Sequence, residues 1–413
     1  MALQTDGSVR RLVAASVWEA LGDATARTVI PLVAVGVLGA GTGLVGFLNA
    51  VGLLAFLVLG APLGAVADRA SPTRLMMAST VTRAAVAAVG LSAWWSGLLT
   101  GVSGVVLLVV MALVVGAADV VYGTARGALI PRLVDVERVR PVFGRVQTAS
   151  QSGGLLAPIV LVAVLALVPV PLAWAVVLLA YAASALTQRG ITAVQAVVAV
   201  RTPFRRAVRA GFGHLLGQRT LRSVTAANAL ANASAAAANT LLPVIALSAL
   251  GLSPAVYALL GVLGAAAGLA GAATASWLTR VIGLRAARTL GAACLALGAS
   301  TVGILVVAPS LLPGPTSVWL GVESALAGLG ISVMVVAGAD LPARLIPADK
   351  LGVVTGAQQA IVVGIMPLSA VAFGVVGAAS LTSAVVAWAV CSAIAVVLAV
   401  TMPRPAATGC ADR

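Results

Sequence analysis

The sequence predicts an all-α integral membrane protein with 12 transmembrane helices in two pseudo-symmetric six-helix bundles. Hydrophobic residues make up 61% of the chain and charged residues only 9%. Soluble domains are roughly half apolar and about a quarter charged, so most side chains here must face lipid or other helices. The net charge of +14 does not indicate nucleic-acid binding, because the arginines lie between apolar runs rather than in a basic patch interleaved with aromatic residues.

An internal repeat predicts the two bundles. Residues Arg132–Val139 are followed by a glycine and a glutamine, and Arg344–Leu351, 212 residues later, are followed by the same two residues at the same spacing. A repeat half the chain long indicates a half-protein that folds twice. In so apolar a chain, this pattern is typical of transporters.

Twelve apolar runs come close to the roughly 20 residues that a membrane-spanning helix needs. The predicted spans are 14–37, 44–66, 75–97, 103–124, 142–166, 168–187, 224–248, 254–279, 287–308, 316–339, 352–376 and 380–402. The first run carries Glu19, Asp23 and Arg27, which a cleavable signal peptide would not, so we expect it to be the first span.

The connections between spans alternate in charge. The connections 38–43, 98–102, 249–253, 309–315 and 377–379 hold no charged residue. The alternate connections hold Arg69 and Arg74; Arg126, Arg132, Arg138 and Arg140; Arg280 and Arg285; and Arg344 and Lys350. Because arginine-rich and lysine-rich loops stay cytoplasmic, we expect an inner cell membrane protein with both termini in the cytoplasm.

A basic interval divides the two sets of spans. We therefore predict an N-terminal bundle over 1–187, a cytoplasmic linker over 188–223 and a C-terminal bundle over 224–413. Within the linker, Val208, Phe212, Leu215 and Leu216 recur at helical spacing, as in a basic helix on the inner leaflet. A solvated linker is favoured over specific lipid recognition.

Several kinds of chemistry are disfavoured by composition. His214 is the only histidine, and Cys294, Cys391 and Cys410 share no metal-ligand spacing, so neither a metal site nor a cofactor is expected. The chain has no nucleophile–base set and no phosphate-binding glycine loop, which argues against an enzyme and against a nucleotide-driven pump.

Three charged residues share one face of the first span. Glu19, Asp23 and Arg27 follow one another at intervals of four, and burying a charge in a membrane costs from about 2.5 kcal/mol upward. One interpretation makes Glu19 or Asp23 a proton-binding group, with Arg27 binding an anionic substrate or tuning the acid. The alternative is an internal Asp23–Arg27 ion pair that only neutralises itself.

Three further charges lie within spans. Arg83 and Asp119 fall at similar depths in the third and fourth spans, and a structural ion pair is the favoured interpretation. Glu323 in the tenth span has no evident partner, which makes it a candidate protonatable carboxyl.

The predicted spans also contain amide side chains and closely spaced glycines. The candidate cavity-lining amides are Asn228, Asn232, Asn239, Gln147, Gln151, Gln358 and Gln359. Such amides also bond helices to one another, so a structural role keeps at least equal weight. Closely spaced glycines, as at Gly261 and at Gly264 and Gly268 four residues apart, predict closely approaching helices.

The connection after the second span resembles the signature of the major facilitator superfamily. Gly64 precedes the pair Asp68-Arg69 by four residues, and Arg74 follows. The resemblance implies the major facilitator fold and a loop that latches the two bundles on the cytoplasmic side. The basic cluster is reduced here to Arg69 and Arg74, which implies a weaker latch.

Two further motifs resemble the branch of that superfamily that contains the enterobactin exporter and the macrolide efflux proteins. They are Leu21-Gly22-Asp23 and Ala128–Val134. The antiporter motif of the fifth helix is incomplete, because Ala157-Pro158 is not followed by paired glycines. The arginine that many antiporters of the superfamily carry early in the fourth helix is also missing.

The resemblance implies a secondary exporter of a small amphipathic organic compound, with protons as the coupling ion. The alternative is a lipid or lysophospholipid flippase of the same fold; a membrane scaffold is disfavoured by the charges within the spans. At the 212-residue offset, Glu19 and Asp23 correspond to Ala231 and Ala235. We therefore expect the ion-coupling residues mainly in the first half, with Glu323 the candidate in the second.

Overall fold

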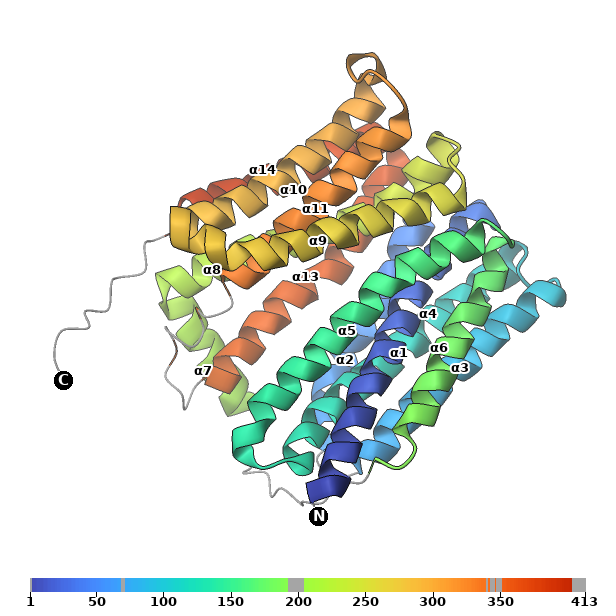
Figure 1. Ribbon diagram of the computed structural model, residues 1–413. Coiled ribbons are helices and arrows are strands. Elements are labelled where there is room, and N and C mark those ends of the chain that lie inside the picture. Colours follow the sequence, from blue (N-terminus) through green and yellow to red (C-terminus); the bar gives the residue numbers. More distant parts are fainter. Residues whose placement is uncertain are drawn as a thin grey trace. The chain divides into compact units, whose positions relative to one another are not determined.

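The structure is a computed structural model, and it describes residues 2–67, 71–191, 204–338, 341, 346 and 351–402. Within these ranges nearly every residue is helical, and each of the twelve predicted spans coincides with a long helix (Figure 1). The first six are α1 (Ala2–Gly36), α2 (Thr42–Ala67), α3 (Pro72–Trp95), α4 (Gly101–Leu133), α5 (Val136–Leu165) and α6 (Trp174–Gln188). The second six are α8 (Arg219–Val244), α9 (Pro254–Ile282), α10 (Leu284–Val307), α11 (Thr316–Ala337), α13 (Leu351–Ala379) and α14 (Leu381–Val400).

Ten of the described helices are long and apolar enough to cross a membrane. The other two predicted spans are α1, which carries its three charges mid-helix, and α2, whose side chains are described only to Leu54. The predicted all-α membrane fold is confirmed.

Several helices are longer than the apolar runs that predicted them. α1 begins at Ala2 rather than near residue 14, and α4 continues to Leu133 rather than ending near 124. The length of an apolar run reflects the thickness of the hydrocarbon core, whereas the backbone hydrogen bonds of the helix can continue into the polar sequence beyond it. In the sixth span the α-helix is shorter than the apolar run, because Val170–Ala173 form a 3₁₀ turn before α6 begins.

The chain forms two compact units. Unit 1 comprises Met1–Val200 with two short segments, Asn239–Val262 and Ala370–Ala378, and unit 2 comprises the rest. Because these units group residues by packing rather than by chain order, the boundaries predicted at 187/188 and 223/224 stay a prediction.

In unit 1, α1 packs against α5 and α6, while α3 packs against α4 and α6 (Figure 1). α2 packs against α4. The largest residue of the core is Trp174 at the start of α6, which is fully buried among residues of α1, α3 and α4. The segment of α13 in this unit meets α2, where Thr42 Oγ1 donates to the carbonyl oxygen of Gly374 over 3.1 Å.

In unit 2, α10 packs against α11 and α14. A buried hydroxyl pair joins α8 to α14: Ser234 and Ser392 lie 2.8 Å apart, and the indole N–H of Trp388 donates to Ser234 Oγ over 2.8 Å. The predicted linker helix is α7 (Phe204–Gly217). Its Leu215 is buried with Leu221 and Val354, so part of its apolar face packs on unit 2 rather than on lipid.

The 212-residue repeat recurs in the backbone of each unit. α3 spans Pro72–Trp95 and α10 spans Leu284–Val307, so the two helices begin and end at equivalent positions. In unit 1 a Cβ on Gly116 would overlap the carbonyl oxygen of Gly52, and in unit 2 a Cβ on Gly328 would overlap that of Gly264. These pairs are related by the same offset, and they confirm the predicted close approach of glycine-bearing helices.

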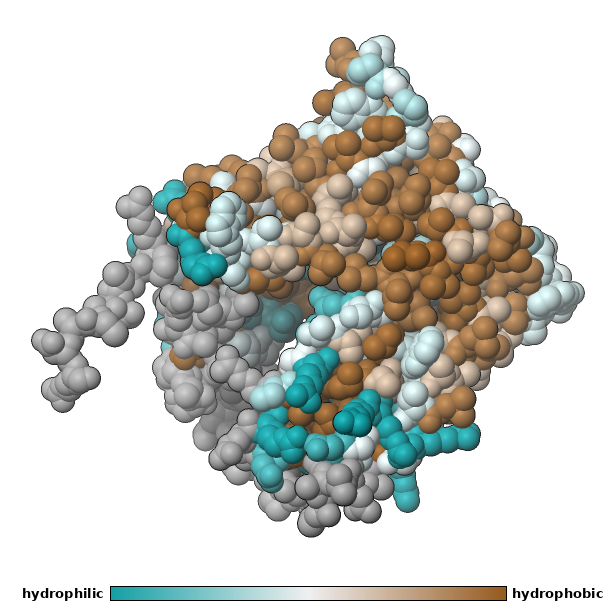
Figure 2. All heavy atoms as spheres, viewed as in Figure 1, coloured by the Kyte–Doolittle hydropathy of each residue, from teal (hydrophilic) through white to brown (hydrophobic). Residues whose placement is uncertain are grey.

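The visible surface of unit 1 is divided by polarity. Apolar residues cover the middle of its helices, and hydrophilic residues gather where α1 and α5 begin (Figure 2). The exposed arginines there include Arg10, Arg11, Arg138 and Arg145. This distribution is typical of a membrane protein whose arginines lie outside the hydrocarbon.

Candidate functional site

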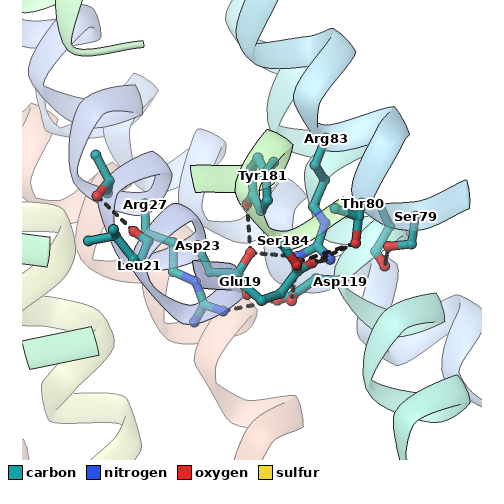
Figure 3. A network of polar contacts seen from close by, with 12 residues as sticks. Glu19, Leu21, Asp23, Arg27, Ser79, Thr80, Arg83, Asp119, Tyr181 and Ser184 are labelled. Carbon is teal, nitrogen blue, oxygen red and sulfur yellow. Dashed lines mark hydrogen bonds and ion pairs between the residues drawn. The ribbon is translucent and has the colours of Figure 1, made fainter. Parts of the chain in front are cut away.

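A fully buried arginine, Arg83, lies inside unit 1. It extends from α3 toward α1 and α4, where three carboxylates converge on it (Figure 3). Arg83 forms an ion pair with Glu19; its Nη1 lies 2.5 Å from Asp23 Oδ1 and 3.5 Å from Asp119 Oδ1. One guanidinium therefore serves acids from two helices.

Helical periodicity explains why α1 supplies two of these acids. Glu19 and Asp23 lie one turn apart on the face of α1 that meets α3, which confirms that the charges of the first span share a face. Arg27, one further turn along, lies 2.9 Å from Asp119 Oδ2 of α4. The interpretation of a self-contained Asp23–Arg27 pair is therefore wrong, since each residue has its ion pair with a different helix.

Polar side chains from α3 and α6 complete the surroundings of Glu19. Ser184 Oγ donates to Glu19 Oε2 over 2.5 Å, and Thr80 Oγ1 lies 3.2 Å from both carboxylate oxygens. Gln188 Nε2 in turn donates to both hydroxyl oxygens, at 2.8 Å for Thr80 and 2.9 Å for Ser184. Glu19 of α1 is thus held in one orientation by side chains of α3 and α6.

Two tyrosines enclose the guanidinium of Arg83. Its carbon lies 5.0 Å from the ring centre of Tyr122 and 4.8 Å from that of Tyr181, within the range of cation–π attraction. The Tyr181 hydroxyl also donates to Asp23 Oδ1 over 2.6 Å. Gly22 makes this approach possible, because a Cβ there would lie 2.9 Å from Tyr181 Cε1.

The exposure of the charged side chains rises in steps across the network. Glu19 is 2% exposed, Asp23 16%, Asp119 38% and Arg27 65%. Three carboxylates and two guanidiniums leave a formal charge of −1 when all five are ionised. One bound proton would make the network neutral, so the arrangement suits the uptake and release of a proton.

The predicted Arg83–Asp119 pair is present, but it is one contact of this five-residue network rather than an isolated structural pair. The sequence interpretation missed Thr80, Tyr122, Tyr181, Ser184 and Gln188. Their signal was faint, since single hydroxyls and tyrosines in apolar helices are common. Only the packing of α3 and α6 on α1 brings them to the acids.

Glu323, the candidate of the second half, lies in α11 and is 1% exposed. Ser324 Oγ lies 3.3 Å from its Oε2, and none of the ion pairs among the described residues includes it. Its role in proton coupling stays a prediction.

Four of the seven candidate amides line one pocket in unit 2. Asn228 and Asn232 of α8 line a cavity of about 260 Å³ together with Gln358 and Gln359 of α13. The other three are elsewhere: Gln147 and Gln151 are exposed on α5, and Asn239 is exposed in unit 1.

The same pocket contains Arg288 of α10, which the sequence interpretation overlooked. Its signal was present, because it is a single arginine inside the predicted span 287–308. It lies on the buried stripe of α10 with Gly291, Ala292 and Leu295. At 1% exposure, this arginine is directed into the unit rather than toward a connection.

The predicted loop motif is described only in part. Gly64 lies within α2 and Arg74 is exposed in the first turn of α3. Asp68 and Arg69 lie outside the described residues. The latch therefore stays a prediction.

Solved structures share this architecture at low sequence identity. A single-residue mutant of the nucleoside transporter NupG superposes with a TM-score of 0.77 at 12% identity, covering 96% of this chain and 100% of that one. A bacterial homologue of the iron transporter ferroportin gives 0.75 at 16% identity, covering 96% and 98%. A bacterial homologue of the lysosomal transporter Spinster gives 0.68 at 13% identity, covering 97% of each chain. These likenesses concern the fold.

No protein of curated function matches the chain significantly in sequence. The family model of the Major Facilitator Superfamily, in contrast, matches residues 12–370, which include all of the network around Arg83 and the pocket around Arg288. Since this match covers most of the chain, and the described residues form twelve long helices with a repeat of half the chain, the protein belongs to the Major Facilitator Superfamily.

Proposed function

We propose that this transporter is a proton-coupled secondary exporter of small amphipathic organic compounds, such as an antibiotic or a siderophore-like metabolite. It works by alternating access and exchanges its substrate for protons. Such an antiporter would contribute to multidrug resistance when its substrates are antibiotics. Membership of a transporter superfamily supports the general class, and the Arg83 network supports the coupling ion.

The charge count of the network is the observation that carries the proposal. Three carboxylates share two guanidiniums inside a membrane-spanning unit, where an uncompensated charge is costly. A network with one acid in excess is neutral only when it holds a proton. A purely structural ion-pair cluster has no need of the third carboxylate.

The exposure steps suggest how the proton moves. Asp119 and Asp23 are partly exposed, whereas Glu19 is enclosed behind Arg83. We assign entry to Asp119 and Asp23 and the innermost position to Glu19. Arg83 contacts all three acids, so its guanidinium can turn toward whichever acids are ionised.

The sequence supports two further parts of the proposal. The one-sided distribution of arginine supports a location in the inner cell membrane with both termini in the cytoplasm. Leu21-Gly22-Asp23, which contributes both Asp23 and the glycine beside Tyr181, supports a position near the enterobactin exporter and macrolide efflux branch.

The test is efflux driven by a pH gradient. In everted membrane vesicles that carry the protein, ethidium transport is measured over a range of pH, with and without an uncoupler. We expect Glu19→Gln and Asp23→Asn to abolish the dependence on the gradient. The matched control is Asp6→Asn, an exposed acid that pairs with Arg138 outside the network and should leave transport unchanged. Efflux by both network variants that matches the wild type at every pH would refute the proton role.

Translocation of a lipid or lysophospholipid is the second candidate. The pocket of unit 2 favours this candidate, because it is lined both by amides and Arg288 and by apolar side chains such as Val362 and Ile331. An amphipathic lipid requires such a combination for its head group and its apolar chain. Movement of a labelled lysophospholipid in liposomes, without any ethidium efflux, would favour this candidate over drug export.

A further inference from the structure

Two buried arginines in this protein have opposite surroundings. Arg83 of unit 1 contacts three carboxylates, whereas Arg288 of unit 2 contacts none among the described residues. Both side chains are at least 99% buried, at 0% and 1% exposure. A buried guanidinium without a counter-charge is strongly unfavourable, so the surroundings of Arg288 are incomplete without an anion.

The bonds of Arg288 hold it in place without neutralising it. Its Nη1 donates to the carbonyl oxygen of Met334 over 2.8 Å, and its Nη2 donates to Asn228 Oδ1 over 2.9 Å. Both acceptors are uncharged. Its Nε is buried and has no hydrogen-bond partner among the described residues, so part of the donor fork remains available.

The pocket around Arg288 is rich in hydrogen-bond donors. A guanidinium only donates, so Asn228 must present its oxygen to Arg288, which leaves the amide N–H₂ group of Asn228 as a donor. Gln358 and Gln359 also line the pocket, and no Asp or Glu is among the described residues that line it. A fixed cation surrounded by neutral amides complements an oxyanion.

The size of the pocket limits what it can hold. Its volume of about 260 Å³ lies just below the roughly 300–1,000 Å³ of pockets that enclose a drug-sized ligand. Gly338, at the end of α11, lets the guanidinium approach the backbone closely, because a Cβ there would lie 2.5 Å from Arg288 Nη1. The pocket therefore fits one head group, with the apolar side chains of Ile331, Val362 and Val363 beside it.

We infer that this pocket is an oxyanion subsite, in which Arg288 binds a carboxylate or phosphate group carried on an apolar body. Asn228 is a positioning residue that fixes the guanidinium. The inference rests on the proposed transport function for its biological meaning and narrows the substrate to anionic or zwitterionic amphipathic compounds. Binding itself requires no gradient.

Equilibrium dialysis of the purified full-length protein with radiolabelled benzoate tests the subsite. We expect benzoate to bind and benzamide, its neutral isostere, to bind about tenfold more weakly or not at all, because a charge-assisted hydrogen bond is lost. Phenyl phosphate should compete with benzoate. Equal binding of benzoate and benzamide by the wild-type protein would overturn the inference without recourse to any variant.

Substitutions locate the binding. Arg288→Gln should weaken benzoate binding about tenfold or more, and Arg288→Lys should retain part of it, because the charge remains and the fork geometry is lost. The control is Arg285→Gln, one turn away on α10 and outside the lining of this pocket, which should bind as the wild type does. Benzoate binding by a folded Arg288→Gln protein that equals the wild type would overturn the inference.

Asp340 follows Gly338 by two residues in the sequence; it lies outside the described residues and is therefore tested directly. If it permanently neutralised Arg288, benzoate would bind to Asp340→Asn and not to the wild-type protein, and that result would overturn the inference. Binding by the wild-type protein, unchanged or tightened in Asp340→Asn, supports it.

Two further measurements distinguish a lipid from a soluble organic anion and separate a failure of the subsite from a failure of the proposed transport function. Displacement of benzoate by lysophosphatidylglycerol, but not by monoolein, would assign the subsite to a lipid head group; displacement only by soluble acids would assign it to a free organic anion. Asp6→Asn, which lies outside the Arg83 network, should bind benzoate as the wild type does. If the wild-type protein binds benzoate while its efflux proves independent of a gradient, the transport proposal fails and the subsite stands.

Discussion

The guanidinium of Arg83 and the carboxylate of Glu19 form an ion pair in which both side chains are enclosed, at 0% and 2% exposure. The pair joins α3 to α1 at a point that α6 covers with Ser184 and Gln188. Its stability depends on both partners, because removing one leaves a desolvated charge that the other no longer compensates.

Arg83→Gln should therefore be among the most destabilising single substitutions in unit 1. We expect a loss of about 3–5 kcal/mol, the cost of leaving buried acids without their cation. The measurement is the unfolding midpoint of the purified protein in detergent or lipid nanodiscs.

The double variant Arg83→Gln/Glu19→Gln provides the control for that prediction. It removes one acid together with the cation, so it should recover part of the lost stability. A double variant as unstable as the sum of the two single variants would mean that the Arg83–Glu19 pair contributes no coupling energy.

Gly22 should control the position of Tyr181. In Gly22→Ala the new methyl group would lie 2.9 Å from Tyr181 Cε1, so the ring must move and the 2.6 Å bond to Asp23 must lengthen. We expect Gly22→Ala and Tyr181→Phe to reduce gradient-driven efflux in the same direction, as vesicle transport assays can measure.

The matched control for that prediction is Gly127→Ala, since a Cβ on Gly127 meets nothing within 4 Å. Wild-type behaviour of Gly22→Ala alongside an impaired Tyr181→Phe would show that the ring accommodates the methyl group without losing Asp23.

The fold was predictable because lipid imposes a simple rule on sequence. Each span needs a long apolar run, so the runs at 254–279 and 380–402 located α9 and α14 closely. Helix ends were less predictable: α4 continues through Pro131 to Leu133 because polar sequence can remain helical beyond the membrane.

The site was predictable only along single helices. The spacing of Glu19, Asp23 and Arg27 determined their shared face, but it could not reveal that Arg27 contacts Asp119 or that Arg83 contacts Glu19. Those contacts depend on how α1, α3 and α4 are rotated against one another, which one sequence does not determine.

The glycine pairs related by the repeat allow the two halves to be compared. Gly116→Ala and Gly328→Ala place a methyl group onto the carbonyl oxygens of Gly52 and Gly264, respectively. Because backbone cannot move aside as a side chain does, we expect each variant to lose about 1–3 kcal/mol or more of stability. Unfolding midpoints of the two variants should fall by similar amounts if the helix crossings are equivalent.

Gly123→Ala and Gly356→Ala are the controls for these crossings, because neither Cβ would meet an atom within 4 Å. They should be neutral or stabilise the protein by about 0.4–1 kcal/mol through the reduced entropy of the unfolded chain. A neutral Gly328→Ala beside a destabilised Gly116→Ala would show that the close helix crossing matters only in unit 1.

Glu323→Gln distinguishes a coupling site in unit 2 from one in unit 1. The side chain is 1% exposed, and its carboxylate accepts a hydrogen bond from the hydroxyl of Ser324. The amide oxygen of a glutamine can accept the same bond. We expect the variant to lie within about 1.5 kcal/mol of the wild type in stability, as near-isosteric substitutions do. If the coupling proton binds in the Arg83 network, as proposed, the variant retains gradient-dependent efflux. The same substitution at Glu19 should abolish that dependence. If instead Glu323→Gln loses the dependence and Glu19→Gln keeps it, the proton is carried by α11, and the Arg83 network is a structural element of unit 1.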